Sequence, residues 1–157
     1  MNVVLRIELL ELGHEVWRTA VVPAEITLDG LHRVVQASMG WQDRHLHQWR
    51  DDLHAWGPEP DEGDDDEREV RVGDVLSEEG SSLEYEYDFG DSWQHLVTAV
   101  GRDEGAARVE LLDGAGACPP EDCGGWPGYD DLVASGAADP EAFDLAAAQR
   151  RVRRVSG

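Results

Sequence analysis

The chain is short, strongly acidic and without lysine. Its 157 residues, 41% of them hydrophobic, are enough for one domain with its own apolar core. Thirteen basic residues against 34 acidic ones give a formal net charge of −21 at pH 7. Because DNA-binding surfaces neutralise phosphates with lysine and arginine, this balance disfavours direct DNA binding. The lack of lysine also excludes a P-loop lysine and a Schiff-base lysine.

The N-terminal residues predict neither an export signal nor a membrane segment. Arg6 and Glu8 interrupt the first apolar run, and no window reaches the roughly 18 apolar residues that span a bilayer. Without an export signal, Cys118 and Cys123 are interpreted as thiols or ligands rather than as a structural disulfide. We therefore expect a cytoplasmic protein without a membrane partner.

The first third of the chain predicts a hairpin, a helix and another strand. Residues 3–10 and 16–22 are rich in β-branched residues and predict two strands joined by a turn at Gly13 and His14. Thr27 is typical of a helix N-cap, apolar residues follow at helical spacing, and Gly40 is typical of a C-cap. Residues 45–50, extended as far as position 56, predict a third strand.

A dense run of carboxylates follows at residues 58–69, here called the acidic loop. Eight of the eleven residues from Glu59 to Glu69 are acidic, which is typical of a solvated, mobile segment. The carboxylate spacing does not match an EF-hand. We expect the acidic loop to be dispensable for the fold, because its charges repel one another and it has no apolar anchor.

The remaining residues predict strands and then helices. Residues 72–76 suit one helical turn, residues 83–89 and 93–100 a hairpin around Gly90 and Asp91, and residues 108–112 a further strand. Two helices are expected at residues 129–135 and 141–151, with a short basic tail at residues 150–157. The prediction is a single α+β domain over residues 1–157. It has an antiparallel β-sheet, one helix after the first hairpin and further helices near the C-terminus.

The predicted hairpin turn also assigns side chains to faces. If Gly90 and Asp91 are the two turn residues, one face carries Glu86, Asp88, Trp93 and His95. A carboxylate beside a histidine orients the ring and raises its pKa, which suits metal binding or proton transfer. Ordinary cross-strand polar pairs are the alternative explanation.

Histidines and cysteines supply the candidate metal ligands. His45 and His47 on one strand face would lie roughly 6.6 Å apart along the backbone, which permits a shared ion. Cys118 and Cys123 lack the paired spacing of a zinc ribbon but leave a mixed Cys/His zinc site open. The alternatives are packed histidines, a cysteine nucleophile served by His95, and a rigid loop that contains the cysteines.

Two dense segments define the candidate site. We expect any chemical site to form where the hairpin of residues 88–95 meets the loop of residues 118–125. The candidate pocket residues are Asp88, Asp91, Trp93, His95, Glu121 and Asp122. The candidate metal ligands are His45, His47, His95, Cys118 and Cys123. The cofactor is unknown, with a divalent metal such as zinc as the candidate, and a packed polar cluster without a ligand is the alternative.

Several motifs follow one another in a specific order. They are Val16-Trp17-Arg18, Leu31-His32, Gly40-Trp41, His45-Leu46, Tyr87-Asp88-Phe89-Gly90-Asp91-x-Trp93-x-His95 and Pro119-Pro120-Glu121-Asp122-Cys123-Gly124-Gly125-x-x-Gly128-Tyr129. In this order they resemble the plasmid pRiA4b ORF-3-like family over about residues 1–145. The resemblance implies an α+β fold with an antiparallel sheet and an association with plasmids and transposons. Some members carry a resolvase label, but this chain has no serine- or tyrosine-recombinase signature, so that activity is not carried over.

Three functions remain open at this point. The leading one is a small cytoplasmic binding or accessory protein with an unknown protein or small-molecule partner. The first alternative is a metal-dependent hydrolase that uses a pocket of His, Asp and Cys side chains. The second is a nucleic-acid accessory protein, which the salt dependence of DNA binding would reveal. No catalytic signature decides whether the protein is an enzyme.

Overall fold

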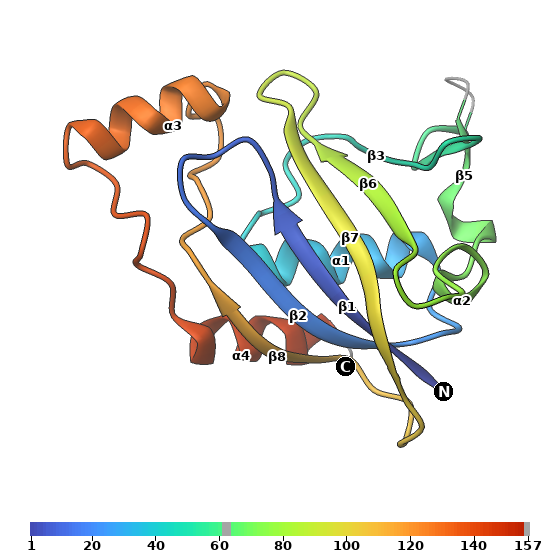
Figure 1. Ribbon diagram of the computed structural model, residues 1–157. Helices are drawn as coiled ribbons and strands as arrows, with labels where there is room; N and C mark the ends of the chain where they lie inside the picture. The colour runs from blue at the N-terminus through green and yellow to red at the C-terminus, as the bar shows by residue number, and fades with distance from the viewer. Residues whose placement is uncertain (61–63, 156–157) are drawn as a thin grey trace.

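The computed structural model describes residues 1–60 and 64–155 (Figure 1). The strands are β1 (Asn2–Leu9), β2 (Val16–Pro23), β3 (His47–Arg50), β4 (Ala55–Gly57), β5 (Asp65–Asp66), β6 (Ser82–Tyr87), β7 (Trp93–Asp103) and β8 (Glu110–Ala115). The helices are α1 (Leu28–Met39), the 3-10 helix η2 (Glu67–Glu69), α2 (Val72–Val75), α3 (Gly125–Ala134) and α4 (Leu145–Val155). Within these described ranges, no helix is both long and apolar enough to cross a membrane.

The strands form one sheet. In the part of the chain that the structure describes, it has eight strands in the order β5-β4-β3-β6-β7-β1-β2-β8. Neighbouring strands are antiparallel, except that β4 and β5 run parallel. The first hairpin, the helix after it and the two C-terminal helices are all present. The predicted α+β fold class is therefore confirmed.

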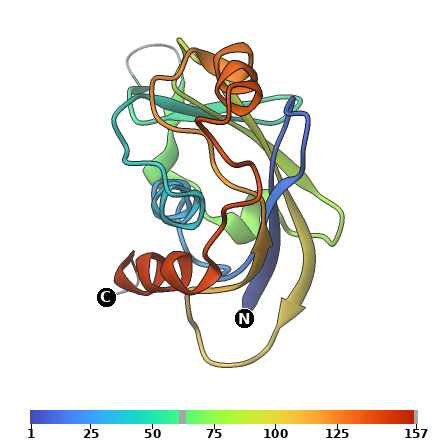
Figure 2. The ribbon, with the colours of Figure 1, turned by 90° about the vertical axis from the view of Figure 1, so that its left-hand side faces the viewer.

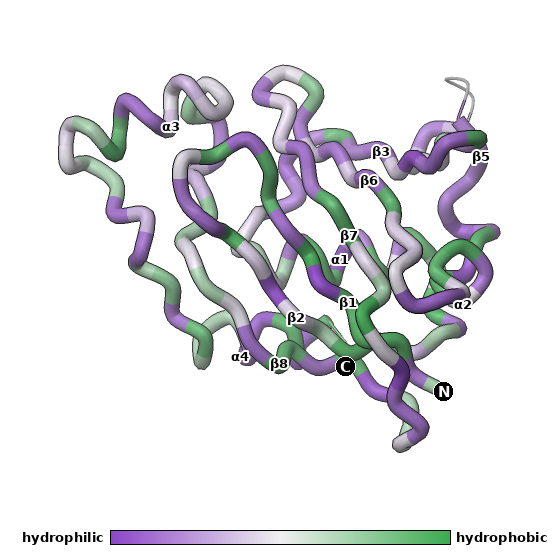
Figure 3. Tube along the Cα trace, in the orientation of Figure 1, coloured by the Kyte–Doolittle hydropathy of each residue, from purple (hydrophilic) through white to green (hydrophobic). Residues whose placement is uncertain are grey.

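The core lies between the sheet and α1. Alternate residues of β1 point to opposite faces of the sheet, and its hydrophobic and hydrophilic residues alternate accordingly (Figure 3). Leu5 and Ile7 of β1 and Leu31 of α1 are fully buried. Helix α1 covers one face of the sheet, and α4 packs against α1 and β8 (Figures 1 and 2). On the other face, Arg6 lies over the Trp17 ring and pairs with Glu8.

Helix α1 begins and ends as the sequence predicts. Thr27 is its N-cap residue, and Gly40 ends it in the left-handed conformation at φ 103°, donating its N–H to the Gln36 carbonyl. Only glycine adopts this conformation without steric cost, which explains the position of the helix end.

Several element boundaries differ from the prediction. The expected strand at residues 45–56 is divided into β3 and β4, because the Asp51 carboxylate accepts the N–H groups of Leu53 and His54 in a turn. Helix α4 begins at Leu145, where the Asp144 carboxylate accepts the Ala147 N–H. The predicted basic tail is the last part of α4 as far as residue 155, and Val152 is buried in the core. Residues 156–157 lie outside the described residues.

The acidic loop is more structured than its composition predicts. Residues 61–63 lie outside the described residues, but residues 65–66 pair with β4 and residues 67–69 form the 3-10 helix η2. Glu67 is only 3% exposed and pairs with His47 at 2.7 Å. The prediction of a solvated segment is therefore wrong for Glu67, whose carboxylate pairs with the buried His47, whereas Asp65, Arg68 and Glu69 are exposed.

Candidate metal centre

The β6–β7 hairpin has a longer connection than predicted. Tyr87 lies opposite Trp93, so residues 88–92 form the tip instead of a two-residue turn. Asp88 and Ser92 both have positive φ, at 64° and 58°. The Asp88 Oδ1 atom accepts the N–H groups of Gly90 and Asp91 at 3.1 and 3.3 Å, which stabilises the turn from inside. The predicted register is wrong by one residue on one strand.

This register moves His95 and Trp93 to the core face of the sheet. The His95 side chain is fully buried, and its Nδ1–H donates to the carbonyls of Tyr85 and Trp93 at 3.1 and 3.0 Å. Its Nε2 accepts the indole N–H of Trp41 at 3.3 Å. Burial lowers the pKa of His95 to about 4, so the ring is neutral at pH 7. Both nitrogens are engaged, and the structure places His95 away from the expected pocket.

The hairpin tip does meet the loop of residues 118–125. The Gly124 N–H donates to Asp91 Oδ2 at 3.3 Å. The Tyr87 hydroxyl donates to the two Glu121 oxygens at 2.9 and 3.1 Å, and one of these oxygens also accepts the Gln42 N–H at 2.8 Å. The two segments singled out in the sequence therefore lie side by side, tied by Asp91 and Glu121.

A third segment brings His45 to the same place. His45 Nε2 lies 2.7 Å from Asp122 Oδ1 and 3.5 Å from Asp88 Oδ2. Since Asp88 Oδ1 is held by two backbone N–H groups, its Oδ2 is the oxygen turned towards His45. Asp122 also has positive φ, at 58°. Such backbone conformations concentrate at functional sites, although aspartate tolerates them better than most residues.

The side chains of this trio form one of the groups that could hold a metal ion. His45 Nε2 is buried and has no hydrogen-bond partner, because the nearby carboxylate oxygens are poorly aligned with it. The three potential ligand atoms lie within 4.8 Å of one another. Bonds of about 2.1 Å to a tetrahedral ion place its ligands about 3.4 Å apart. The His45–Asp88 distance of 3.5 Å matches this spacing, whereas the His45–Asp122 distance of 2.7 Å is shorter and would have to lengthen around an ion. We call His45, Asp88 and Asp122 the metal-ligand trio.

A second polar cluster, formed by His32, Asp43, His47 and Glu67, has a different geometry. The two imidazole rings stack in parallel, 3.6 Å apart with an interplanar angle of 8°. Their Nε2 atoms each contact a carboxylate, Asp43 at 2.9 Å and Glu67 at 2.7 Å. The ligand atoms of His32, Asp43 and His47 lie within 4.8 Å of one another, but in-plane lone pairs of parallel rings do not converge on one ion. We therefore interpret this cluster as a hydrogen-bonded network between the core and the exposed Asp43.

The contacts in this cluster also determine the protonation state of His32. Its Nδ1 contacts the Tyr85 hydroxyl at 2.7 Å, so both ring nitrogens have partners. Burial and the adjacent His47 lower the pKa of His32 to about 4, against the opposite effect of Asp43. The structure places His45 and His47 in different groups of potential metal ligands, which favours the alternative that they do not share an ion. His45 precedes β3, and the two rings belong to different clusters.

The two cysteines lie close to the site but do not join a set of metal ligands. In the described ranges, none of the groups of three or more potential metal ligands contains a cysteine. Burial raises the pKa of Cys118 and, to a smaller extent, of Cys123, which disfavours the thiolate in both. Both thiols are free. The mixed Cys/His zinc site, which the sequence left open beside a rigid loop, is not among these groups of described residues.

Comparison with known proteins identifies the family. The model of the family described as "Plasmid pRiA4b ORF-3-like protein" matches residues 2–152. This chain belongs to the plasmid pRiA4b ORF-3-like family. The uncharacterized protein y4hQ of Sinorhizobium fredii (strain NBRC 101917 / NGR234) is 39% identical over 143 residues, covering 87% of this chain and 73% of y4hQ. The crystal structure of MM3350 from Methanosarcina mazei Go1 has a TM-score of 0.82 and 29% identity, covering 93% of this chain and 95% of MM3350.

Membership of the pRiA4b ORF-3-like family accounts for the fold and leaves the function open. MM3350 is itself described as a protein of unknown function. Sequence reasoning placed Asp88, Asp91, Glu121 and Asp122 together, and the structure brings these four and His45 to one place. The sequence did not indicate the cluster around His32, because the burial of His32, His47 and Glu67 depends on contacts between distant segments.

Proposed function

We propose that this chain is a small binding or accessory protein that acts through one divalent metal ion held by the metal-ligand trio. The proposal is carried by one observation: the buried His45 Nε2 atom has no hydrogen-bond partner and faces two carboxylate oxygens. One imidazole nitrogen with two carboxylate oxygens suits zinc, manganese or ferrous iron. Calcium and magnesium prefer ligand sets made of oxygen.

The proposed ion is accessible from solvent. The Asp122 side chain is 57% exposed and the His45 side chain 30% exposed, whereas Asp88 is buried, so solvent reaches the trio from the side of Asp122. Three protein ligands leave at least one coordination position for water or a bound molecule. The net charge of −21 raises the local concentration of cations around the protein. These features support a site where a metal ion and a ligand meet.

A metal-dependent hydrolase is the second candidate, because an open coordination position is also what metal-assisted hydrolysis requires. The contacts of Glu121, which precedes Asp122 in the sequence, argue for a binding function instead of hydrolysis. Glu121 accepts hydrogen bonds from Tyr87 and Gln42. Burial and Glu121 raise the pKa of Tyr87 well above its usual value, so the phenol stays protonated and keeps Glu121 occupied as an acceptor. Glu121 is therefore a poor general base as it stands.

We retain the cytoplasmic location and the accessory role beside mobile elements as parts of this proposal. The free thiols of Cys118 and Cys123 are in keeping with a reducing compartment. The plasmid named in the family description supports the link to mobile elements. A nucleic-acid accessory role is disfavoured by the net charge.

Metal titration tests the proposal directly. Chelator-treated, untagged protein should bind about one equivalent of zinc or manganese by calorimetry, and elemental analysis should find the ion after metal-supplemented growth. His45→Ala and Asp88→Asn should each weaken binding at least about 100-fold. The control is His54→Ala, which removes an exposed histidine that stacks on Trp56.

Three outcomes separate the alternatives. Less than about a tenth of an equivalent of zinc or manganese bound at saturation in the calorimetric titration would contradict the proposal. Equal binding by the wild type and both trio variants would place the ion elsewhere. Metal-dependent turnover of bis-p-nitrophenyl phosphate that His45→Ala abolishes would favour the hydrolase.

A further inference from the structure

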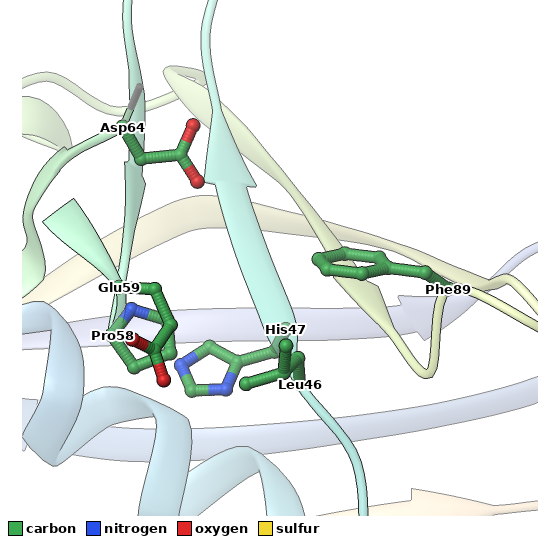
Figure 4. A pocket seen from close by; sticks show the side chains of 6 residues that line it. All are labelled: Leu46, His47, Pro58, Glu59, Asp64 and Phe89. Carbon is green, nitrogen blue, oxygen red and sulfur yellow. The ribbon is translucent and has the colours of Figure 1, made fainter. Parts of the chain in front are cut away.

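A cavity of about 420 Å³ lies beside the metal-ligand trio. It is lined by Leu46, His47, Pro58, Glu59, Asp64 and Phe89 (Figure 4). Two of these residues follow trio members directly in the sequence, Leu46 after His45 and Phe89 after Asp88. The cavity and the trio therefore share two chain segments, although no trio residue lines the cavity.

The apolar part of the cavity is unusually exposed. Leu46 and Phe89 are 48% and 50% exposed. Phe89 lies in the hairpin tip, beyond the last strand pair of Tyr87 with Trp93, so no facing strand covers its ring. Figure 4 shows Phe89 on one side of the cavity and Pro58, Glu59 and Asp64 on the opposite side. Exposed aromatic and aliphatic side chains at the edge of a cavity are typical of a binding surface.

The charged part of the cavity is negative. Glu59 and Asp64 supply two carboxylates, and no arginine is among the described residues of the lining. His47 is the remaining titratable group, and its Nε2 already pairs with Glu67. The whole chain carries a net charge of −21, which favours a cationic ligand at long range as well.

We propose that this cavity binds a lysine or arginine side chain of a partner protein. The aliphatic stem packs on Leu46 and Pro58, and the cationic group lies between the Phe89 ring and the carboxylates of Glu59 and Asp64. An aromatic ring attracts a cation through its face, and long basic side chains cover apolar surface with their stems. The volume lies within the usual range for a ligand cavity, about 300–1,000 Å³. Since the chain has no lysine, a lysine side chain in this cavity has to come from another protein.

The inference goes beyond the proposed metal function and does not rest on it. None of the trio residues lines the cavity, so a basic side chain can bind to metal-free protein. Failure of metal binding and failure of peptide binding are therefore separate results.

Fluorescence anisotropy with short peptides tests the inference. The probe is a labelled, acetylated and amidated glycine-flanked peptide with two lysines, and its matched control has norleucine in place of both lysines. We expect the double variant Glu59→Gln with Asp64→Asn to weaken binding of the lysine peptide about tenfold, and Phe89→Ala to have an effect of similar size. The double variant Glu78→Gln with Glu79→Gln removes the same two charges from exposed positions outside the cavity lining and should bind as the wild type does.

Several results would overturn the inference. Equal binding of the norleucine peptide would show that the cationic group is not recognised. Equal weakening by the Glu78 and Glu79 control would show that only the overall charge matters. Displacement of the lysine peptide by spermidine at an equal concentration would assign the cavity to free polyamines instead of a protein partner. No binding to metal-free protein would also overturn it.

Discussion

The buried His95 ring makes the stability of this protein depend on pH. The pKa of His95 is about 4 in the folded chain, against an ordinary value of 6.5. Below about pH 6.5 the unfolded chain binds a proton that the folded chain does not bind. The free energy of unfolding that depends on the neutral state of His95 is therefore fully present above pH 6.5, decreases as the pH falls, and is lost when the pH reaches about 4. A proton on His95 Nε2 would also remove the hydrogen bond from Trp41, because two N–H donors would then face each other.

The size of the effect follows from the two pKa values. The separation between 6.5 and about 4 corresponds to about 3 kcal/mol, of which about 2 kcal/mol is lost between about pH 7.5 and pH 5. His32 adds a loss of the same sign, because burial and His47 lower its pKa to about 4 as well. The wild-type chain should therefore lose several kcal/mol of unfolding free energy over this interval.

Urea unfolding of His95→Gln tests this reasoning. Glutamine cannot take up the proton, so the variant should lose about 2 kcal/mol less than the wild type between about pH 7.5 and pH 5, whatever its stability at neutral pH. His54→Gln, which replaces an exposed histidine, is the control and should keep the wild-type pH dependence. An identical loss in the wild type and His95→Gln would refute the assignment of a neutral, buried His95.

Two further predictions concern the acidic loop and the loop of residues 118–125. Glu67→Gln should reduce the unfolding free energy by about 3 kcal/mol, because it leaves His47 without its buried carboxylate. The control Glu69→Gln changes an exposed residue and should have little effect. Equal denaturant midpoints for the two variants would mean that the acidic loop is dispensable after all. Gly128→Ala should lower the thermal midpoint by several degrees and weaken metal binding, because its Cβ would lie 1.9 Å from the Cys123 carbonyl oxygen. Gly13→Ala, with open space around it, is the matched control, and a Gly128→Ala midpoint as high as that of the control would contradict the tight loop described here.

The elements that the sequence predicted well are those set by local chemistry. The first hairpin follows from β-branched alternation, and α1 follows from Thr27, its apolar spacing and Gly40. The meeting of the hairpin tip with the loop of residues 118–125 was predicted because both segments are dense in polar residues. Sequence could indicate the two segments, but it could not determine which of their side chains face each other.

The errors come from features that depend on three-dimensional contacts. A shift of one residue in a hairpin moves every side chain on one strand to the opposite face, and here the shift depends on the left-handed conformation of Asp88. His95 consequently moved from the expected pocket to the core. Glu67 could not be distinguished from its acidic neighbours, because its burial depends on His47, 20 residues away in the sequence.

The interior position of β1 in the sheet, between β2 and β7, has a consequence for synthesis of the chain. One edge of β1 pairs with β2 soon after both are made, but the other edge pairs with β7, which begins only at Trp93. At about 5–20 residues per second, a ribosome completes β7 roughly 5–20 s after β1. During this interval the nascent hairpin presents an unpaired edge that other chains can join. Arg6 and Glu8 lie along that strand, and charged side chains at an open edge discourage such pairing. The surface charges of β1 thus protect the hairpin before the sheet is complete.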